Sequence, residues 1–386
     1  MRIALFSECY SPIVNGVVVA VATLRRELLR PGHQVYLFAP RYPGHQDDEP
    51  NIFRWPSISL PTNPRYPLGV PILPKRFLRR IEDFSPEVIH THSLFGMGRV
   101  ATRVARRLKI PLILTYHTLL EDYSHYIPLP KPIVRRLARR LSRNFSNRAD
   151  FVIAPGPAAL NVLRSYGVTS PIEVIPTGAD LFLAQGDFTA PISARWQIPP
   201  GAPVVAFVGR IAREKNLELL LEAFAQVNKR ITQAQLLLIG AGPWQEEVLR
   251  FAARLGLTEK VHVTGFLPHH EVFHTLAHAQ VFAFPSLTDT QGIVVLEAMA
   301  CGLPAVAVQS GAVAGILREG EEGLLPEPEP AAFAAALLCL LEDEALRGRM
   351  GAKARLRAQE FSSAICAARV TELYRQVIAA RRARIA

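Results

Sequence analysis

Short apolar runs of strand length alternate with helical stretches along this chain, and the alternation starts twice. The first series of apolar runs lies at 2–7, 34–39, 87–91, 111–116, 151–154 and 172–175. Residues 176–203 are rich in Pro, Gly and Ala, and a second series follows at 203–208, 235–239, 261–263, 281–284 and 305–308. Strands that alternate with helices predict βαβ units and a mainly parallel sheet. The sequence therefore predicts an α/β fold with two halves of similar size and a cleft between them.

Length and composition agree with two packed domains. The chain has 386 residues, of which 49% are hydrophobic, and domains usually hold ~100–200 residues. No apolar run reaches the ~18 residues that a membrane span needs without meeting a charge. Glu8 interrupts the N-terminal apolar run before a signal peptide could form, so we expect a cytoplasmic protein. The four cysteines form no CxxC pair, and we expect buried thiols rather than a zinc or redox motif.

Positive charge is confined to the first half of the chain. The formal net charge is +11; residues 1–180 hold 24 Lys and Arg against 13 Asp and Glu, whereas residues 181–386 hold 20 of each kind. The first half should therefore meet an anionic partner, which could be nucleic acid, an acidic substrate or an anionic membrane surface. Two basic segments supply the candidate membrane-binding residues, which are Lys75, Arg76, Arg79, Arg80, Lys131, Arg135, Arg136, Arg139, Arg140 and Arg143.

The segment 131–148 has the pattern of a cationic amphipathic helix. Ile133, Leu137, Leu141 and Phe145 recur at four-residue spacing, and arginines occupy the other faces. Such a helix is typical of attachment to a membrane surface, where each cation contributes ~1 kcal/mol near an anionic leaflet. The alternative is a surface helix whose apolar stripe packs on its own domain. Phe145 is the single aromatic residue of this segment, and the lack of aromatic residues interleaved among its arginines disfavours nucleic-acid binding.

Two loops that join a strand to a helix could bind phosphate. Asn15-Gly16 precedes the first helix, where a small residue and a helix N-terminus favour a phosphate group, although such a Gly commonly only makes a turn. In the loop 209–216, Arg210 offers a planar fork and Lys215 a point charge. Loops at the carboxyl ends of parallel strands are where ligands bind. These two cations could converge on a diphosphate, or they could belong to a solvated cationic loop.

The stretch 286–302 is the most informative in the sequence. Asp289 lies in a loop, and Glu297 follows eight residues later inside the apolar helix VVLEAMA. A carboxylate in such a helix is costly unless it meets hydroxyl groups or a cation. Sugar hydroxyls would satisfy that need, and a salt bridge between helices is the alternative. The helix N-terminus near Gly292 can also face a phosphate.

These residues resemble the E-x7-E signature of family-4 retaining glycosyltransferases. The stretch 289–304 has the sequence DTQGIVVLEAMACGLP, and the Gly209-Arg210…Lys215 loop, the turn 239–243 and the linker 176–180 match the same family in order. The resemblance implies a GT-B fold of two Rossmann-like domains facing across a cleft. Residues 1–182, with the last helix 362–386 crossing back, would form the acceptor and membrane-binding domain. Residues 183–361 would bind the nucleotide-sugar.

Within the family, the chain resembles the diacylglycerol glucosyltransferases. The segment 115–118 and the run from Tyr123 to Pro128 are similar to theirs, which would place His117 near the donor sugar and leaves His125 as a weaker candidate. The first acid of the signature is Asp289 instead of Glu, and this side chain is one methylene shorter. The implied catalytic residues are His117, Arg210, Lys215 and Asp289. The implied donor-binding residues are Gly16, Gly209, Arg210, Lys215, Gly240, Phe266, Gln291, Gly292, Ile293 and Glu297.

The resemblance implies an enzyme that moves glucose from UDP-glucose to a membrane lipid, most naturally 1,2-diacylglycerol, at the cytoplasmic face of the membrane with retention of configuration. GDP-mannose as donor, and a phosphatidylinositol-type lipid or a soluble sugar as acceptor, stay open. Enzymes of this kind need no metal or other cofactor. The spacing of His270, His274 and His278, next to His269, could suit a metal, but a wet helix face is the more common arrangement.

Overall fold

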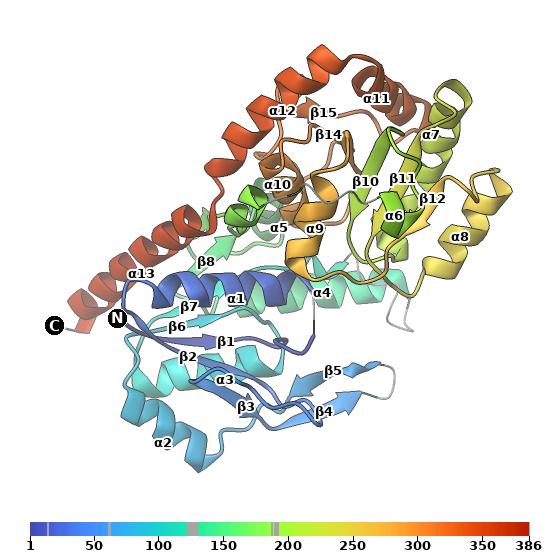
Figure 1. Cartoon of the computed structure of the whole chain (residues 1–386). Helices are drawn as coiled ribbons and strands as arrows, with labels where there is room; N and C mark the ends of the chain where they lie inside the picture. Colours follow the sequence, from blue (N-terminus) through green and yellow to red (C-terminus); the bar gives the residue numbers. More distant parts are fainter. Residues whose placement is uncertain (14, 61–62, 122–129, 187, 189–192, 386) are drawn as a thin grey trace. The chain divides into compact units, whose positions relative to one another are not determined.

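The computed structural model describes residues 1–13, 15–60, 63–121, 130–186, 188 and 193–385 (Figure 1). The chain divides into two compact units. The N-terminal unit consists of Met1–Gly178 together with Ser363–Ala386, and the C-terminal unit is Ala179–Ser362. Each unit has a parallel β-sheet of its own, as the repeated alternation of strands and helices predicts.

The sheet of the N-terminal unit has seven strands in the order β3-β2-β1-β6-β7-β8-β9, and every neighbouring pair is parallel. The strands are β1 (Arg2–Phe6), β2 (Gln34–Pro40), β3 (Ile52–Trp55), β6 (Val88–Thr91), β7 (Leu112–Thr115), β8 (Phe151–Ala154) and β9 (Ile172–Val174). A separate antiparallel hairpin pairs β4 (Ser57–Leu60) with β5 (Asn63–Gly69). The strand order reverses between β1 and β6, and ligands of open α/β sheets bind beside such a reversal.

Helices cover both faces of this sheet. Ile3 and Leu5 of β1 pack with α1 (Gly16–Leu29) and α13 (Ser363–Ile385), whereas Ala4 and Phe6 pack on the opposite face. Side chains alternate between the two faces of a strand, and this divides the apolar residues of β1 between two cores. The second face is covered by α2 (Lys75–Phe84), α3 (Gly96–Leu108), α4 (Lys131–Ser146) and α5 (Pro157–Ser165). The last helix of the chain thus belongs to the N-terminal unit.

The C-terminal unit repeats this plan with six parallel strands in the order β12-β11-β10-β13-β14-β15. They are β10 (Val204–Val208), β11 (Gln235–Ile239), β12 (Val261–Val263), β13 (Val281–Phe284), β14 (Ala305–Ala307) and β15 (Gly323–Leu324). One face packs on α7 (Leu217–Arg230), α8 (Gln245–Arg254) and α11 (Pro330–Glu342), and the other on α9 (His269–Leu276), α10 (Ile293–Ala300) and α12 (Glu344–Gln359). Here the order reverses between β10 and β13. Shorter elements are α6 (Ser193–Trp196) and the 3-10 turns η2 (Leu181–Gln185) and η3 (Arg213–Lys215).

A glycine brings two strand ends of this sheet close together. Gly240 follows β11 with φ of 143°, and a Cβ atom on it would lie 2.0 Å from the carbonyl oxygen of Gly209, which follows β10. Only a residue without a side chain suits this backbone conformation and this close approach. The loops after β10 and β11 therefore pack backbone to backbone.

Several elements have no counterpart in the alternating pattern of the sequence. They include the edge strand β3, the hairpin β4–β5, helix α2 and helix α5. The hairpin strand β5 contains Pro64 and Pro67, and proline is typical of edge strands, where it weakens the sequence signal of a strand. Among the described residues, no helix has both the length and the apolar character that crossing a membrane requires.

Candidate active site

An ion pair lies at the strand reversal of the C-terminal unit. Lys215 follows β10, Asp289 follows β13, and these are the two strands between which the order reverses. The Lys215 Nζ atom lies 2.7 Å from Asp289 Oδ1 and 2.9 Å from Oδ2. Both side chains are about four-fifths buried. The structure thus brings together two of the predicted catalytic residues at the edge where a ligand is expected.

Further contacts join the same two loops. The Arg210 guanidinium contacts the carboxylate of Glu214, whose side chain is buried. The Thr288 hydroxyl donates to the main-chain oxygen of Glu214 over 3.3 Å, and the Asn216 side-chain amide donates to the Pro285 oxygen over 3.2 Å. Arg210 and Lys215 each contact a carboxylate: Arg210 contacts Glu214 of its own loop, and Lys215 contacts Asp289 of the loop after β13.

Glu297 lies in α10 and is almost completely buried. Its Oε1 atom is 2.7 Å from Nε2 of His269, the first residue of α9. The sequence left a contact between helices open as the alternative role of this acid, and the structure contains such a contact. The rings of His274 and His278 lie farther along the chain, with centroids 4.9 Å apart and planes tilted by 53°. In the part of the chain that the structure describes, no group of three His, Cys, Asp or Glu residues is placed to hold a metal ion.

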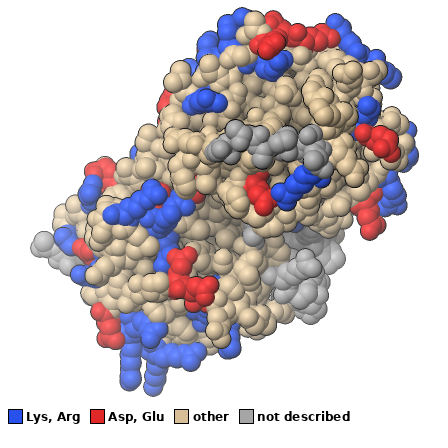
Figure 2. Space-filling view, viewed as in Figure 1, with Lys and Arg blue, Asp and Glu red and all other residues tan. Residues whose placement is uncertain are grey.

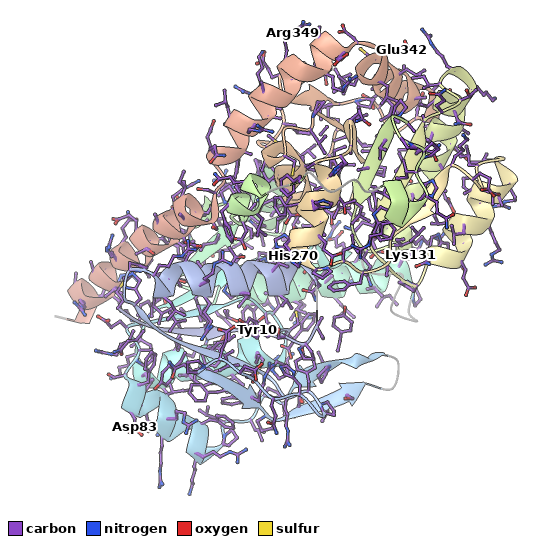
Figure 3. The ribbon with its side chains drawn as sticks, in the orientation of Figure 1. Tyr10, Asp83, Lys131, His270, Glu342 and Arg349 are labelled. Atoms are coloured by element: carbon purple, nitrogen blue, oxygen red, sulfur yellow. The ribbon has the colours of Figure 1, made fainter. Side chains whose placement is uncertain are left out.

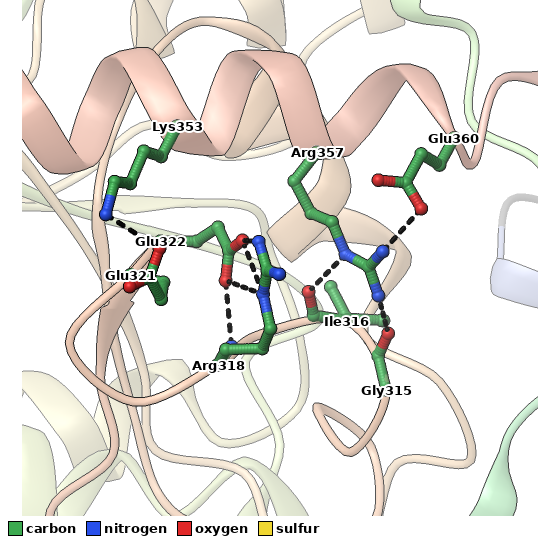
Figure 4. Close-up of polar contacts among 8 residues, drawn as sticks. All are labelled: Gly315, Ile316, Arg318, Glu321, Glu322, Lys353, Arg357 and Glu360. Atoms are coloured by element: carbon green, nitrogen blue, oxygen red, sulfur yellow. Dashed lines mark hydrogen bonds and ion pairs between the residues drawn. The ribbon is translucent and has the colours of Figure 1, made fainter.

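The turn before α10 is supported by a loop that follows β14. The Gly292 amide donates to the Ala312 oxygen over 3.0 Å, and Ile293 begins the helix. Arg357 of α12 holds the next part of that loop, since its guanidinium donates to the Gly315 oxygen over 2.7 Å and also contacts Glu360 (Figure 4). The same view shows Arg318 bound to the buried Glu322 and Lys353 bound to Glu321. The turn that contains the predicted donor residue Gly292 is therefore hydrogen-bonded to a loop that α12 in turn holds in place.

The remaining predicted donor residues of this unit lie on nearby strand ends. Gly209 and Gly240 occupy the close approach between β10 and β11, and Gln291 is half-buried in the turn before α10. Phe266 lies between β12 and α9, and 63% of its surface is exposed. A large apolar side chain exposed at such a loop is available to a planar ligand group.

In the N-terminal unit, the predicted phosphate-binding turn opens α1. The Asn15 side-chain oxygen accepts a hydrogen bond from the Val18 amide over 2.9 Å, which caps the helix. A Cβ atom on Gly16 would meet no other atom within 4 Å. The start of α1 thus follows β1, one of the two strands at the reversal of this unit.

Glu8, which no motif singled out, bridges the same reversal. Its carboxylate accepts hydrogen bonds from the Gly69 amide (2.6 Å), the Ser93 hydroxyl (2.8 Å) and the Met97 amide (2.9 Å). Burial raises the pKa of Glu8, and the three hydrogen bonds oppose that rise. Met97 lies in the first turn of α3, where a negative group is favourable. Glu8 therefore joins β1, the hairpin strand β5 and α3.

His117 belongs to a cluster of three histidines that sequence reasoning found only in part. Its Nε2 atom is 2.8 Å from Nδ1 of His92, and His90 lies beside His92 with ring centroids 4.2 Å apart. His90 is fully buried between Tyr374 of α13 and Thr115 of β7. Burial lowers the pKa of His90 to about 3 and that of His117 to about 4, and it lowers the pKa of His92 well below its ordinary value. All three imidazoles are therefore neutral near pH 7. The weaker candidate His125 lies outside the described residues.

Both basic segments form helices that expose their charges. In α2, Lys75, Arg76, Arg79 and Arg80 are exposed, and Figure 2 shows Lys and Arg side chains projecting where Figure 1 places this helix, which ends near Asp83 (Figure 3). Lys131, also labelled in Figure 3, begins α4, and the five candidate arginines of α4 are exposed as well. The buried stripe of α4 is Val134, Ala138, Ser142 and Phe145. Ile133 and Leu137 of the predicted apolar stripe are 50% and 54% exposed, whereas Phe145 of the same stripe is buried.

Solved structures define the fold of the protein. Sucrose-phosphate synthase from Thermosynechococcus elongatus matches over 98% of this chain and 99% of its own, with a TM-score of 0.78 and 24% identity. The Anabaena protein Alr3699/HepE, solved in complex with UDP-glucose, matches over 97% and 100% with a TM-score of 0.76 and 20% identity. Together with the two parallel sheets, these matches confirm the predicted GT-B fold of two Rossmann-like domains with a helical C-terminus.

Sequence comparison then identifies the family. A model of glycosyltransferase family 4 matches residues 14–182, and a model of glycosyl transferases group 1 matches residues 189–357. The alpha-monoglucosyldiacylglycerol synthase of Streptococcus pneumoniae is 32% identical over 325 residues, which cover 80% of this chain and 71% of that protein. A GDP-mannose-dependent alpha-mannosyltransferase of Mycobacterium tuberculosis is 30% identical over 332 residues, covering 84% and 83%. The chain belongs to the family-4, group 1 glycosyltransferases and is a glycosyltransferase.

Proposed function

We propose that the protein is a retaining glucosyltransferase that moves glucose from UDP-glucose to the hydroxyl of 1,2-diacylglycerol at a membrane surface. The observation that supports this most is the Lys215–Asp289 pair across the strand reversal of the C-terminal unit, within a signature shared with the family. The name of the Streptococcus pneumoniae relative, and that of a 27% identical synthase from Acholeplasma laidlawii, supports the lipid acceptor. The Anabaena complex supports the donor.

In the proposed reaction the acceptor oxygen forms a bond to C1 of glucose while the bond from C1 to the UDP oxygen breaks. Attack on the same face needs no enzyme nucleophile, because the leaving phosphate takes the proton of the acceptor hydroxyl. Arg210 and Lys215 would stabilise the negative charge that develops on the diphosphate, which is the main contribution such a site makes. Asp289 and His117 would bind sugar hydroxyls, and Glu297 would bind the ribose. No metal or other cofactor takes part in this scheme.

Membrane attachment of the proposed enzyme is assigned to α2 and α4. Six cations of α4 are exposed, and Ile133 and Leu137 are exposed between them on the same helix. Exposed apolar side chains flanked by arginines suit the boundary between lipid headgroups and acyl chains. The apolar stripe that α4 buries is a different one, and so packing on its own domain leaves these two side chains uncovered.

Radiolabel transfer from UDP-glucose into the organic phase tests donor and acceptor together. The vesicles contain diacylglycerol and an anionic lipid. Transfer that disappears when diacylglycerol is omitted supports the proposal. Slow hydrolysis of UDP-glucose without transfer would support UDP-glucose as the donor and would contradict diacylglycerol as the acceptor. If neither reaction occurs and GDP-mannose is consumed instead, the proposed donor is wrong; the 30% identical mannosyltransferase makes this the second candidate.

Flotation with anionic vesicles tests the membrane assignment by itself. The double variant Ile133→Ser/Leu137→Ser should bind vesicles at least tenfold more weakly, because two apolar side chains of ~1.5–3 kcal/mol each no longer enter the lipid. Leu356→Ser is the matched control, since Leu356 is a 74% exposed leucine on α12 of the C-terminal unit. Equal flotation of all three proteins would show that α4 does not insert. Hydrolysis of UDP-glucose in the absence of vesicles should not change.

A further inference from the structure

Two members of the histidine cluster have no place in the proposed reaction. His92 follows β6 and is 7% exposed, and His90 lies within β6 with no exposed surface. The His92 ring lies between those of His90 and His117, at centroid distances of 4.2 Å and 5.1 Å. His90 is itself held on both ring nitrogens, by the Tyr374 hydroxyl at 2.6 Å and by the Thr115 hydroxyl at 2.7 Å. The His92 ring is therefore fixed against a rigid neighbour.

The contact between His92 and His117 contains a single proton. Because burial keeps both imidazoles neutral, each ring bears one N–H group and one unprotonated nitrogen. Nδ1 of His92 and Nε2 of His117 lie 2.8 Å apart, a hydrogen-bond distance, so one of these nitrogens donates and the other accepts. The direction of this bond decides which nitrogen of His117 bears its proton.

The other nitrogen of His92 indicates the direction. His92 Nε2 is buried and has no hydrogen-bond partner among the described residues. If His117 donated, His92 would have to bear its proton on Nε2 and leave a buried N–H without an acceptor. Unpaired buried N–H groups are rarer than unpaired acceptors, and leaving a buried donor unpaired costs ~1–3 kcal/mol. The arrangement with Nδ1–H on His92 avoids that group.

We propose that His92 is a positioning residue that donates its Nδ1–H to His117 Nε2 and so holds His117 in the tautomer protonated on Nδ1. This inference rests on the proposed function, in which His117 contacts the donor sugar. In this arrangement the Nε2 lone pair of His117 accepts from His92, and so His117 does not act as a base through that nitrogen. His92 acts only through His117, in the way that an outer partner fixes the tautomer and orientation of a working imidazole.

Nitrogen NMR of the histidine rings in the full chain tests the tautomer directly and needs no substrate. In the native protein, His117 should show a protonated Nδ1 and an unprotonated Nε2; the reverse would overturn the proposal. In His92→Leu the two tautomers should mix, and kcat for glucose transfer should fall about 5–10-fold, the value of one hydrogen bond between neutral groups, with little change in the KM for the donor. A His92→Leu protein with native His117 shifts and native kcat would also overturn it.

Two further variants separate this role from general damage. His92→Asn retains an amide N–H near the position of Nδ1, so it should restore the His117 tautomer and most of kcat. His33→Leu makes the same change at a half-buried histidine of the same unit whose contact is with the chain terminus, and it should alter neither measurement. If the tautomer shifts in His92→Leu while kcat does not, the positioning of His117 is supported and its place in the proposed reaction is rejected. The two failures are therefore distinguishable.

Discussion

The two units share one topology and differ in the chemistry at the reversal of strand order. In the C-terminal unit, the loops after β10 and β13 are joined by an ion pair, Lys215 with Asp289. In the N-terminal unit, the corresponding loops after β1 and β6 are joined by Glu8, whose partners are two backbone amides and the Ser93 hydroxyl. The fold provides the edge of the sheet in both cases, and the side chains decide what that edge can bind.

This difference extends to the groups nearby. The acids of the C-terminal edge lie next to Lys215, Arg210 and His269. The N-terminal edge contains a cluster of neutral imidazoles that bond to one another and to hydroxyls. Removal of a charged side chain should therefore affect mainly the C-terminal edge. Protonation should affect mainly the N-terminal edge. The predictions below test this contrast.

Removing the amine of Lys215 should have the largest effect. Lys215→Ala should lower kcat for glucose transfer about 100–1000-fold, since one donor aimed at the charge of the transition state contributes that much in comparable sites. The proper comparison is Lys229→Ala, which removes an exposed lysine at the end of α7 in the same unit and should leave kcat within a factor of two. If the two variants had comparable kcat values, Lys215 would not take part in the reaction.

The close approach of the loops after β10 and β11 predicts a large loss of stability. Gly240→Ala places a Cβ atom 2.0 Å from the Gly209 oxygen at a positive φ, and strained backbone alone costs ~1–3 kcal/mol. Gly348→Ala is the control, because Gly348 lies inside α12 with nothing within 4 Å; it should raise the free energy of unfolding by ~1 kcal/mol. Urea unfolding measures both changes, and a Gly240→Ala protein as stable as the native one would contradict the packing described.

Acid should destabilise the N-terminal unit through its buried histidines. Below pH ~6.5 an unfolded histidine binds a proton, whereas the pKa of folded His90 is about 3. The unfolded state therefore binds more protons, and the free energy of unfolding falls as the pH falls, by up to ~1.4 kcal/mol per unit for each such histidine.

In the variant His90→Gln, the free energy of unfolding should fall less steeply with falling pH, because the contribution of His90 is absent. Urea unfolding of the native protein and of His90→Gln between pH 7 and pH 5 measures the difference. The native protein should show the steeper loss even if the variant is less stable throughout. Parallel curves would mean that His90 is not the neutral, buried group that the structure contains.

Sequence patterns predicted the features of this molecule that depend on residues close to one another in the sequence. The alternation of strands and helices predicted both sheets, and the resemblance of the loop 209–216 and the stretch 289–304 to the glycosyltransferase family implied that Lys215 and Asp289 share a site. Contacts between distant residues have no such signal: His90 meets Tyr374, and Glu8 meets Met97, across long stretches of chain. A four-residue spacing in α4 was visible, but which of two adjacent stripes is buried depends on the sheet beneath. The buried stripe begins at Val134 rather than at Ile133.

The smallest predicted effect compares one helix cap from each unit. Asn15 caps α1 through the Val18 amide, and Asp343 caps α12 through the Leu346 amide, at 2.9 Å and 2.8 Å. Replacing either residue with Ala should lower the free energy of unfolding by ~1 kcal/mol, because one amide at the helix start loses its acceptor. The two variants should therefore be indistinguishable by urea unfolding.

Their activities should differ. Asn15 shapes the turn at the strand reversal of the N-terminal unit, where the proposed donor site includes Gly16, whereas Asp343 lies in the connection between α11 and α12. Asn15→Ala should thus raise the KM for UDP-glucose a few-fold at a temperature where both variants are folded, and Asp343→Ala should not. If both variants lost stability and neither changed KM, the start of α1 would serve the fold alone, and donor binding would belong to the C-terminal unit.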